Sequence, residues 1–151
     1  MGLFPFTANE QASYALAMTH RCGWRGGFDN DEVEALHALG FGHEQRQHDW
    51  AARLDAHSLG WVCARSTGIL VGFVNVAWDG GSHAFILDIV VAEGVRRGGV
   101  GSELVRIAVR EAAAAGCEWV HVDFEGHLKG FYLGACGFDP TDAGLVGLAG
   151  H

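Results

Sequence analysis

Residues 96–102 combine two arginines with three glycines, and this combination is suited to binding a phosphate group. The stretch follows an apolar segment, residues 84–91, and precedes a helix-like segment, residues 103–115. The first N–H groups of a helix lack partners within it and carry partial positive charge. Glycines let a phosphate approach the main chain, and arginines donate paired hydrogen bonds to it. We therefore predict a phosphate-binding turn here, called the phosphate turn below.

Common nucleotide-binding loops do not fit the phosphate turn. No Lys-Ser or Lys-Thr pair closes it, as a P-loop requires. The dinucleotide pattern Gly-x-Gly-x-x-Gly also fails, because Leu104 stands three places after Gly101. A nucleotide-binding domain is therefore disfavoured.

Two motifs of this chain together resemble the GNAT superfamily of N-acetyltransferases. The spacing Arg96-x-x-Gly99-x-Gly101 is similar to the motif with which that superfamily binds the pyrophosphate of acyl-CoA. Some thirty residues later, residues 131–138 resemble its second signature, an aromatic-Tyr pair followed by Gly-Phe. The resemblance covers residues 60–148 and implies acetyl-CoA as the cosubstrate.

The resemblance also implies how acetyl-CoA is bound. The strand over residues 87–91 and the strand after Gly116 would separate, with the pantetheine arm between them. Backbone groups of Ile89 and Val91 would pair with this arm, and an N–H near Val90 would polarise the thioester carbonyl. The implied cofactor-binding residues are Ile89, Val90, Val91, Arg96, Arg97, Gly98, Gly99, Val100, Gly101 and Ser102.

Three residues are candidates for catalysis. Tyr132 matches the family tyrosine that protonates the departing thiolate, and a phenol titrates close enough to a thiol for this role. Phe85 stands where many members have a glutamate or histidine base. The alternatives are Asp88, a lone carboxylate in an apolar strand, and His121, whose side chain suits base catalysis near neutrality. Each also has a structural explanation, and a water relay from either is open.

A second position departs from the family pattern. Glu125 replaces the asparagine, seven places before the tyrosine, that often holds the pantetheine arm.

Composition limits the other possibilities. A length of 151 residues suits one domain over residues 1–151, of which we expect residues 1–11 to be loosely held. The formal charge of −8 disfavours nucleic-acid binding. No apolar run is long enough to span a membrane, and four scattered cysteines favour a reducing, cytoplasmic location. His43, His48 and His57 match no common metal-ligand spacing, so we expect no metal.

Periodicity predicts the order of the elements. We expect an edge strand over residues 12–20, a helix capped by Asp29 and Glu32, and a second helix from Trp50 to His57. Hairpin signals at residues 66–68 and 79–81 then join three strands.

The second half of the chain supplies two further helices and the remaining strands. A helix over residues 103–115 ends at Gly116, and a strand over 117–124, a short helix over 128–135 and a final strand over 143–148 follow. The fold class is α/β (α+β): a single-domain, GNAT-like mixed sheet, largely antiparallel, with helices on both faces.

The acceptor is expected to be a small cationic primary amine. Acidic and aromatic side chains between residues 24 and 50 lie where the family builds its acceptor pocket, although for any single residue a solvated acidic face beside a core cluster is the better explanation. The expected partners are acetyl-CoA, this amine and a second copy in a homodimer. The function predicted is an acetyl-CoA-dependent N-acetyltransferase, and the alternative is a non-catalytic acyl-CoA sensor.

Overall fold

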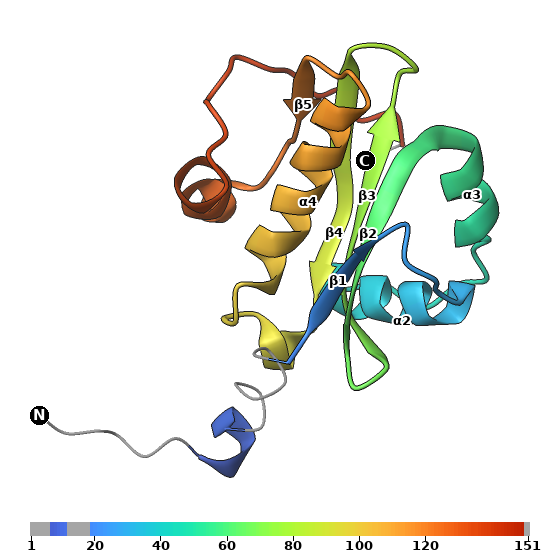
Figure 1. Cartoon of the computed structure of the whole chain (residues 1–151), viewed down its shortest axis with the longest axis vertical. Helices are drawn as coiled ribbons and strands as arrows, with labels where there is room; N and C mark the ends of the chain where they lie inside the picture. Colours follow the sequence, from blue (N-terminus) through green and yellow to red (C-terminus); the bar gives the residue numbers. More distant parts are fainter. Residues whose placement is uncertain (1–6, 12–18, 150–151) are drawn as a thin grey trace, which may run out of the picture.

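The computed structural model describes residues 7–11 and 19–149, which form a five-stranded sheet covered by helices (Figure 1). The strands are Arg21–Trp24 (β1), Ser58–Ser66 (β2), Ile69–Trp78 (β3), His83–Val91 (β4) and Trp119–His121 (β5), and they lie in the order β1-β2-β3-β4-β5. Neighbouring strands are antiparallel except for β4 and β5, which are parallel. The predicted mixed, largely antiparallel sheet is thus confirmed.

Two tight turns set the register of the central strands. Thr67 and Gly68, between β2 and β3, both have positive φ angles, of 49° and 82°, as a two-residue hairpin turn requires. Between β3 and β4, the Asp79 carboxylate accepts the N–H groups of Gly81 at 2.7 Å and His83 at 3.1 Å. Both predicted hairpins are therefore present.

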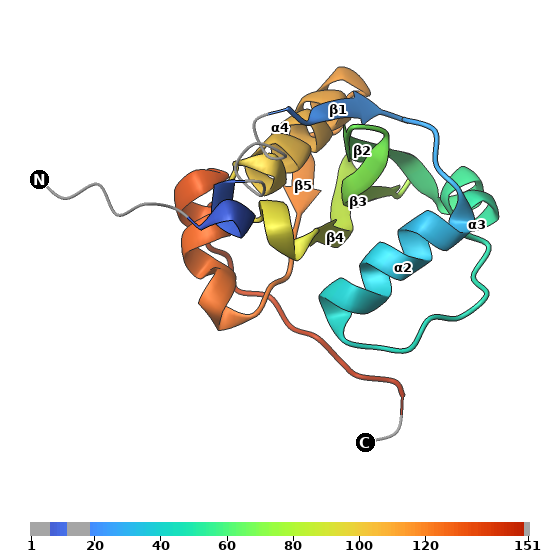
Figure 2. The same cartoon turned by 90° about the horizontal axis from the view of Figure 1, so that it is seen from below.

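Helices cover both faces of the sheet. Helices α2 (Asn30–Phe41) and α3 (Trp50–His57) lie on one face, and α4 (Val100–Ala114) lies on the other (Figure 2). The predicted stripe of α4 is buried in the core, and its members are Val100, Leu104, Ile107, Ala108 and Ala112. Among the described residues, no helix is both long and apolar enough to cross a bilayer.

The helix ends follow the predicted local chemistry. Asp29 is the N-cap of α2, and its N–H donates to Glu32 Oε2 at 3.0 Å in a capping box. Gly116, directly after α4, has φ = 90°, the left-handed conformation expected of a C-terminal glycine.

Other expected elements differ from the structure. The strand expected over residues 12–20 and the loosely held residues 1–11 fall largely outside the described residues, and β1 begins at Arg21. The strand expected over 117–124 is only three residues long, and the helix over 128–135 consists of a 3₁₀ turn, Gly126–Leu128, and a π-helical turn, Gly130–Ala135.

The final strand expected over residues 143–148 is wrong. This segment has no regular structure, and Leu145, Val146 and Leu148 are 86%, 79% and 93% exposed. Its glycines disfavour extended pairing. Apolar residues alone therefore do not make a strand.

Helix α2 approaches β4 closely at Gly40. A Cβ at this position would lie 2.3 Å from Cγ2 of the buried Val90. Valine is stiff at χ1, so this methyl has little room to move. The end of α2 and the outer half of β4 are therefore held in one fixed arrangement.

We predict that Gly40→Ala destabilises the fold although it replaces glycine within a helix. The propensity gain of about 1 kcal/mol should be outweighed by an overpacking cost of roughly 1–3 kcal/mol. Urea unfolding would measure the change, with Leu39→Ala, 82% exposed on the same turn, as the control. A stabilised Gly40→Ala protein would contradict this account of the contact.

Candidate active site

The phosphate turn has the backbone geometry expected of an anion site. Gly99 is the N-cap of α4 with φ = 78°, a conformation that favours glycine, and it offers no side-chain cap. The first N–H groups of α4 therefore lack a capping side chain. Arg96 and Arg97 are exposed, and Arg96 Nε donates to the Val91 carbonyl oxygen at 3.1 Å. This contact fixes Arg96 against the end of β4.

The two sequence motifs meet at Gly101. A Cβ on Gly101 would lie 3.3 Å from Phe131 Cζ and 3.7 Å from Val91 Cγ2. The ring of Phe131 therefore packs where α4 begins, beside the last residue of β4. Phe131, the first residue of the second motif, is thus brought to the phosphate turn.

Strand β4 changes its pairing along its length. Its parallel ladder with β5 runs from His83 to Phe85 and stops, so residues 86–91 have no partner in β5 (Figure 1). On the other side, the β3–β4 register shifts between Phe73↔Val90 and Asn75↔Leu87. This bulge contains Asp88, which has a positive φ of 55°. The expected separation of the two strands is confirmed, and it leaves an open backbone edge beside the phosphate turn.

Tyr132 is buried among aromatic rings. Its ring stacks on Phe124 with centroids 4.8 Å apart and meets Phe131 and Phe138 edge-on. Burial, followed by the nearby Cys136 and Asp123, raises the pKa of Tyr132 to about 12. The phenol is therefore protonated near neutral pH, the state that a proton donor needs. Its catalytic role stays a prediction.

The carboxylate of Asp88 contacts side chains of α2, α3 and β3. Its Oδ1 lies 3.1 Å from His37 Nε2, and its Oδ2 accepts from Arg53 at 2.6 Å and from Asn75 Nδ2 at 3.1 Å. Burial raises the pKa of Asp88, but these hydrogen bonds and the charge of Arg53 lower it more, so it lies below its ordinary value. Asp88 is therefore a carboxylate held in place, as the structural explanation expected, while its role as base is untested.

Sequence reasoning missed His37, although two signals pointed to it. The inward stripe of α2 contains Val33 and Leu36, and His37 follows one position later. An unpaired carboxylate in an apolar strand needs a donor on a neighbouring element. Pairing the two required knowing that α2 crosses β4, which the chain order does not state.

His121 belongs to a different cluster. Its Nε2 lies 2.7 Å from His83 Nδ1, and its ring stacks on Phe85 at 4.7 Å. His121 and Phe85 are exposed and His83 is half-buried, and all three lie where β4 and β5 are still paired, before the bulge. The structure therefore does not bring His121 and Asp88 together.

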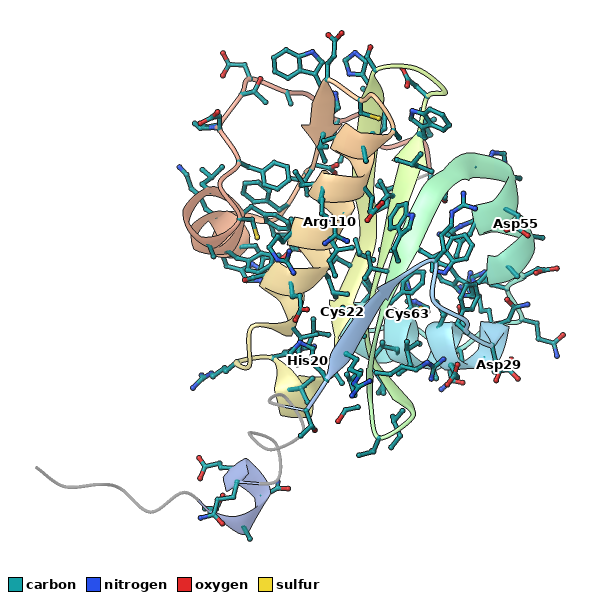
Figure 3. All side chains as sticks on the ribbon, in the orientation of Figure 1. His20, Cys22, Asp29, Asp55, Cys63 and Arg110 are labelled. Carbon is teal, nitrogen blue, oxygen red and sulfur yellow. The ribbon has the colours of Figure 1, made fainter. Side chains whose placement is uncertain are left out.

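The acidic residues near the start of α2 have structural partners. Asp29 forms the helix cap, and Glu32 pairs with Arg65 at 2.7 Å. Asp29 lies at the outer end of α2, whereas the other end of the helix contacts β4 (Figure 3). Trp50, expected near an acceptor pocket, is buried in the core. The explanation as a solvated helix start fits these carboxylates best.

Glu125 stands exposed after β5 and lies 3.3 Å from His127.

Two of the histidines that we expected to bind no metal each contact another side chain. His43 contacts His37, and His48 contacts Glu34. A trio on the β1 side of α4, His20, Cys22 and Glu103, has ligand atoms within 4.8 Å of one another (Figure 3). His20 Nε2 and Glu103 Oε2 are already 2.6 Å apart in an ion pair, and the guanidinium of Arg106 lies 3.9 Å from Glu103.

The fold agrees with the comparisons. Residues 20–138 match the model of the acetyltransferase (GNAT) family, so the chain belongs to this family. No curated protein matches the sequence significantly.

Several solved structures share the fold at low sequence identity. One is a glucosamine-6-phosphate N-acetyltransferase from Arabidopsis thaliana, with 16% identity, a TM-score of 0.69, and 87% of this chain and 99% of that chain covered. A GNAT-family acetyltransferase from Streptococcus pneumoniae has 22% identity, a TM-score of 0.66, and coverages of 85% and 98%. An aminoglycoside N-acetyltransferase in complex with CoA has 20% identity, a TM-score of 0.69, and coverages of 84% and 92%.

We predict that Gly101→Val weakens acetyl-CoA binding on the order of 10-fold or more. The valine side chain would press on Phe131 and keep a phosphate from the helix N–H groups, and each lost charged hydrogen bond is worth about 1.5–3 kcal/mol. Calorimetry would measure the affinity. Gly144→Val, which introduces the same residue into open space, is the control. Unchanged affinity in a folded Gly101→Val protein would refute the site.

Glu34 anchors the loop that carries His43. This buried carboxylate accepts the N–H of Arg46 at 2.8 Å, Trp50 Nε1 at 2.9 Å and His48 Nδ1 at 3.0 Å. Burial alone would raise the pKa of Glu34, but the three hydrogen bonds lower it to about 2. Its stabilising effect is therefore fully present above pH 4.5 and is lost as the pH falls toward 2.

We predict that Glu34→Gln lowers the free energy of unfolding by roughly 1–3 kcal/mol at neutral pH. The variant should also lose less stability on acidification, because the titrating group is gone. Some slope should stay, since the pKa of Glu32 is also about 2. Urea unfolding at neutral and acidic pH would measure both effects, with the exposed Glu44→Gln as the control. An unchanged pH slope would contradict the assignment.

Proposed function

We propose that this protein transfers the acetyl group of acetyl-CoA to a primary amine on a small cationic acceptor. One observation carries the proposal: the phosphate turn, the end of β4 and Phe131, the neighbour of Tyr132 in the chain, meet at Gly101. The phosphate turn suits an anion, and the adjoining edge suits an extended chain with amide groups. The net charge of −8 favours a cationic acceptor.

In this proposal, each step of the reaction is assigned to particular residues. The pyrophosphate is bound by Arg96, Arg97 and the N–H groups that open α4. Backbone groups of Ile89 and Val91 pair with the pantetheine, and the N–H of Val90 polarises the thioester carbonyl. Tyr132 donates its proton to the CoA thiolate as the C–S bond breaks. Asp88 or His121 assists removal of the amine proton.

The cytoplasmic location and the homodimer belong to this proposal. All four cysteines are free thiols, which supports a reducing compartment.

A non-catalytic acyl-CoA sensor is the second candidate. It is favoured by Phe85, where many family members have a base, and by Glu125, where an asparagine often contacts the cofactor. Such a protein would keep the phosphate turn without needing an acceptor site.

A two-stage experiment separates these functions. Calorimetry first measures acetyl-CoA binding, and a CoA-release assay then tests a library of cationic, neutral and anionic amines. Turnover on a cationic amine supports the enzyme. Acetyl-CoA binding without turnover on any amine supports the sensor, and a preference for anionic amines would contradict the acceptor class.

We predict that Tyr132→Phe lowers kcat on the order of 100-fold, because it removes the proton donor. The ring and its packing against Phe124 are retained, so acetyl-CoA affinity should change little. Phe124→Tyr, which adds a hydroxyl to the neighbouring ring, is the matched control. Wild-type turnover in Tyr132→Phe would assign this residue to packing alone.

A further inference from the structure

Two side chains at the start of β1 meet a carboxylate at the start of α4. His20 directly precedes β1, Cys22 lies within it, and Glu103 belongs to the first turn of α4 (Figure 3). His20 and Cys22 are two positions apart, the spacing that places side chains on one face of an extended chain. A nitrogen, a sulfur and an oxygen of these residues lie within 4.8 Å of one another. The three residues are called the β1–α4 trio below.

The donor atoms of the β1–α4 trio are those that zinc prefers. Zinc binds imidazole nitrogen, thiolate sulfur and carboxylate oxygen, and sites with three protein ligands keep a fourth position open. A thiolate also disfavours magnesium and calcium, which take oxygen ligands. Bonds of roughly 2.0–2.3 Å place the ligand atoms of a tetrahedral zinc about 3.4 Å apart. His20 Nε2 and Glu103 Oε2, now 2.6 Å apart, would therefore separate by less than about 1 Å.

Glu103 directs its two oxygens to different partners. Oε2 faces His20 Nε2, whereas Oε1 lies 3.9 Å from the guanidinium of Arg106, three residues further along α4. Arg106 therefore orients the carboxylate and leaves Oε2 on the side of the trio. Outer partners that orient a ligand in this way are a regular part of metal sites.

The β1–α4 trio is half-buried and open to solvent on one side. The side chains of His20 and Glu103 are 11% and 36% exposed, and Cys22 packs against the core under α4. Burial, followed by the charge of Glu103 and a hydrogen bond to it, raises the pKa of Cys22 to about 12. A divalent cation deprotonates a coordinating thiol outright. The cation, thiolate and carboxylate are then neutral together, which suits a half-buried position.

We propose that the β1–α4 trio binds one zinc ion through His20 Nε2, Cys22 Sγ and Glu103 Oε2, with water in the fourth position. Zinc takes the place of the thiol hydrogen and of the hydrogen between His20 and Glu103. The trio contains none of the histidines whose spacing argued against a metal. This inference is independent of the proposed function.

The ion has a structural role. It joins the edge strand β1 to the first turn of α4, two elements that the chain separates by most of the sheet. Gly101, where Phe131 packs, and Glu103 point about 200° apart around the helix axis. The zinc site therefore lies on the opposite side of α4 from the contact between the two motifs.

Cobalt(II), which replaces zinc in such sites and absorbs light, tests the proposal on the full-length, reduced protein. We expect one cobalt ion per chain and a near-ultraviolet charge-transfer band from thiolate to cobalt. Zinc should displace the cobalt and abolish the band. Absence of the band from the wild-type protein would overturn the proposal and leave the trio as a hydrogen-bonded cluster only.

Matched variants locate the ion. Cys22→Ser should abolish the band, and Glu103→Gln and His20→Gln should weaken zinc binding by about 100-fold or more, since even residues around the ligands are typically worth roughly 10–100-fold. Cys117→Ser, at another half-buried thiol, and His57→Gln, at an exposed histidine, should bind as the wild type does. A band retained in Cys22→Ser, or lost equally in Cys117→Ser, would overturn the site.

Thermal unfolding supplies a second measurement that does not depend on the spectrum. An ion that binds the folded chain raises its Tm, so zinc should raise the Tm of the wild type and of Cys117→Ser but not that of Cys22→Ser. Glu103→Gln keeps the size of its side chain and serves the same comparison if Cys22→Ser does not fold. An equal rise in all of these proteins would show that zinc binds elsewhere and would overturn the proposal. Acetyl-CoA and amines are absent from both measurements, so their outcome is separate from that of the proposed function.

Discussion

The structure depends on one interruption in an otherwise regular sheet, the bulge of β4 at Asp88. A non-glycine residue with φ = 55° costs of order 1–3 kcal/mol and persists only where its surroundings enforce it. Here the enforcement comes from contacts to α2, α3 and β3, through His37, Arg53 and Asn75. Asn75 is itself fixed, because its Oδ1 accepts the Ser58 hydroxyl at 2.6 Å. The strain is thus held by side chains on one face of the sheet.

Close to this bulge, the pairing between β4 and β5 also ends. Beyond Phe85, β4 no longer pairs with β5, and α4 begins where β4 ends. The N-terminal end of α4 presents N–H groups there, while the C-terminal end of α2 packs on Val90 from the other side. Two helix ends therefore converge on one short piece of strand.

The features predicted correctly from the sequence are those formed by residues close together in the chain. The hairpin turn at Thr67 and Gly68, the cap at Asp29 and the stripe of α4 each depend on residues within a few positions of one another. The phosphate turn belongs to the same class, since a strand, two glycines and a helix start are contiguous. The motif around Tyr132 was also visible, whereas the packing of Phe131 against Gly101 was found only in the structure.

What the sequence could not supply was pairing over distance. His37 and Asp88 are 51 positions apart, and only the crossing of α2 over β4 brings them together. The strand expected over residues 143–148 was wrong because its apolar residues suited a strand while its glycines disfavour extended pairing. The carboxylates at the start of α2 suggested an acceptor pocket by composition, yet Arg65 and the helix cap account for them.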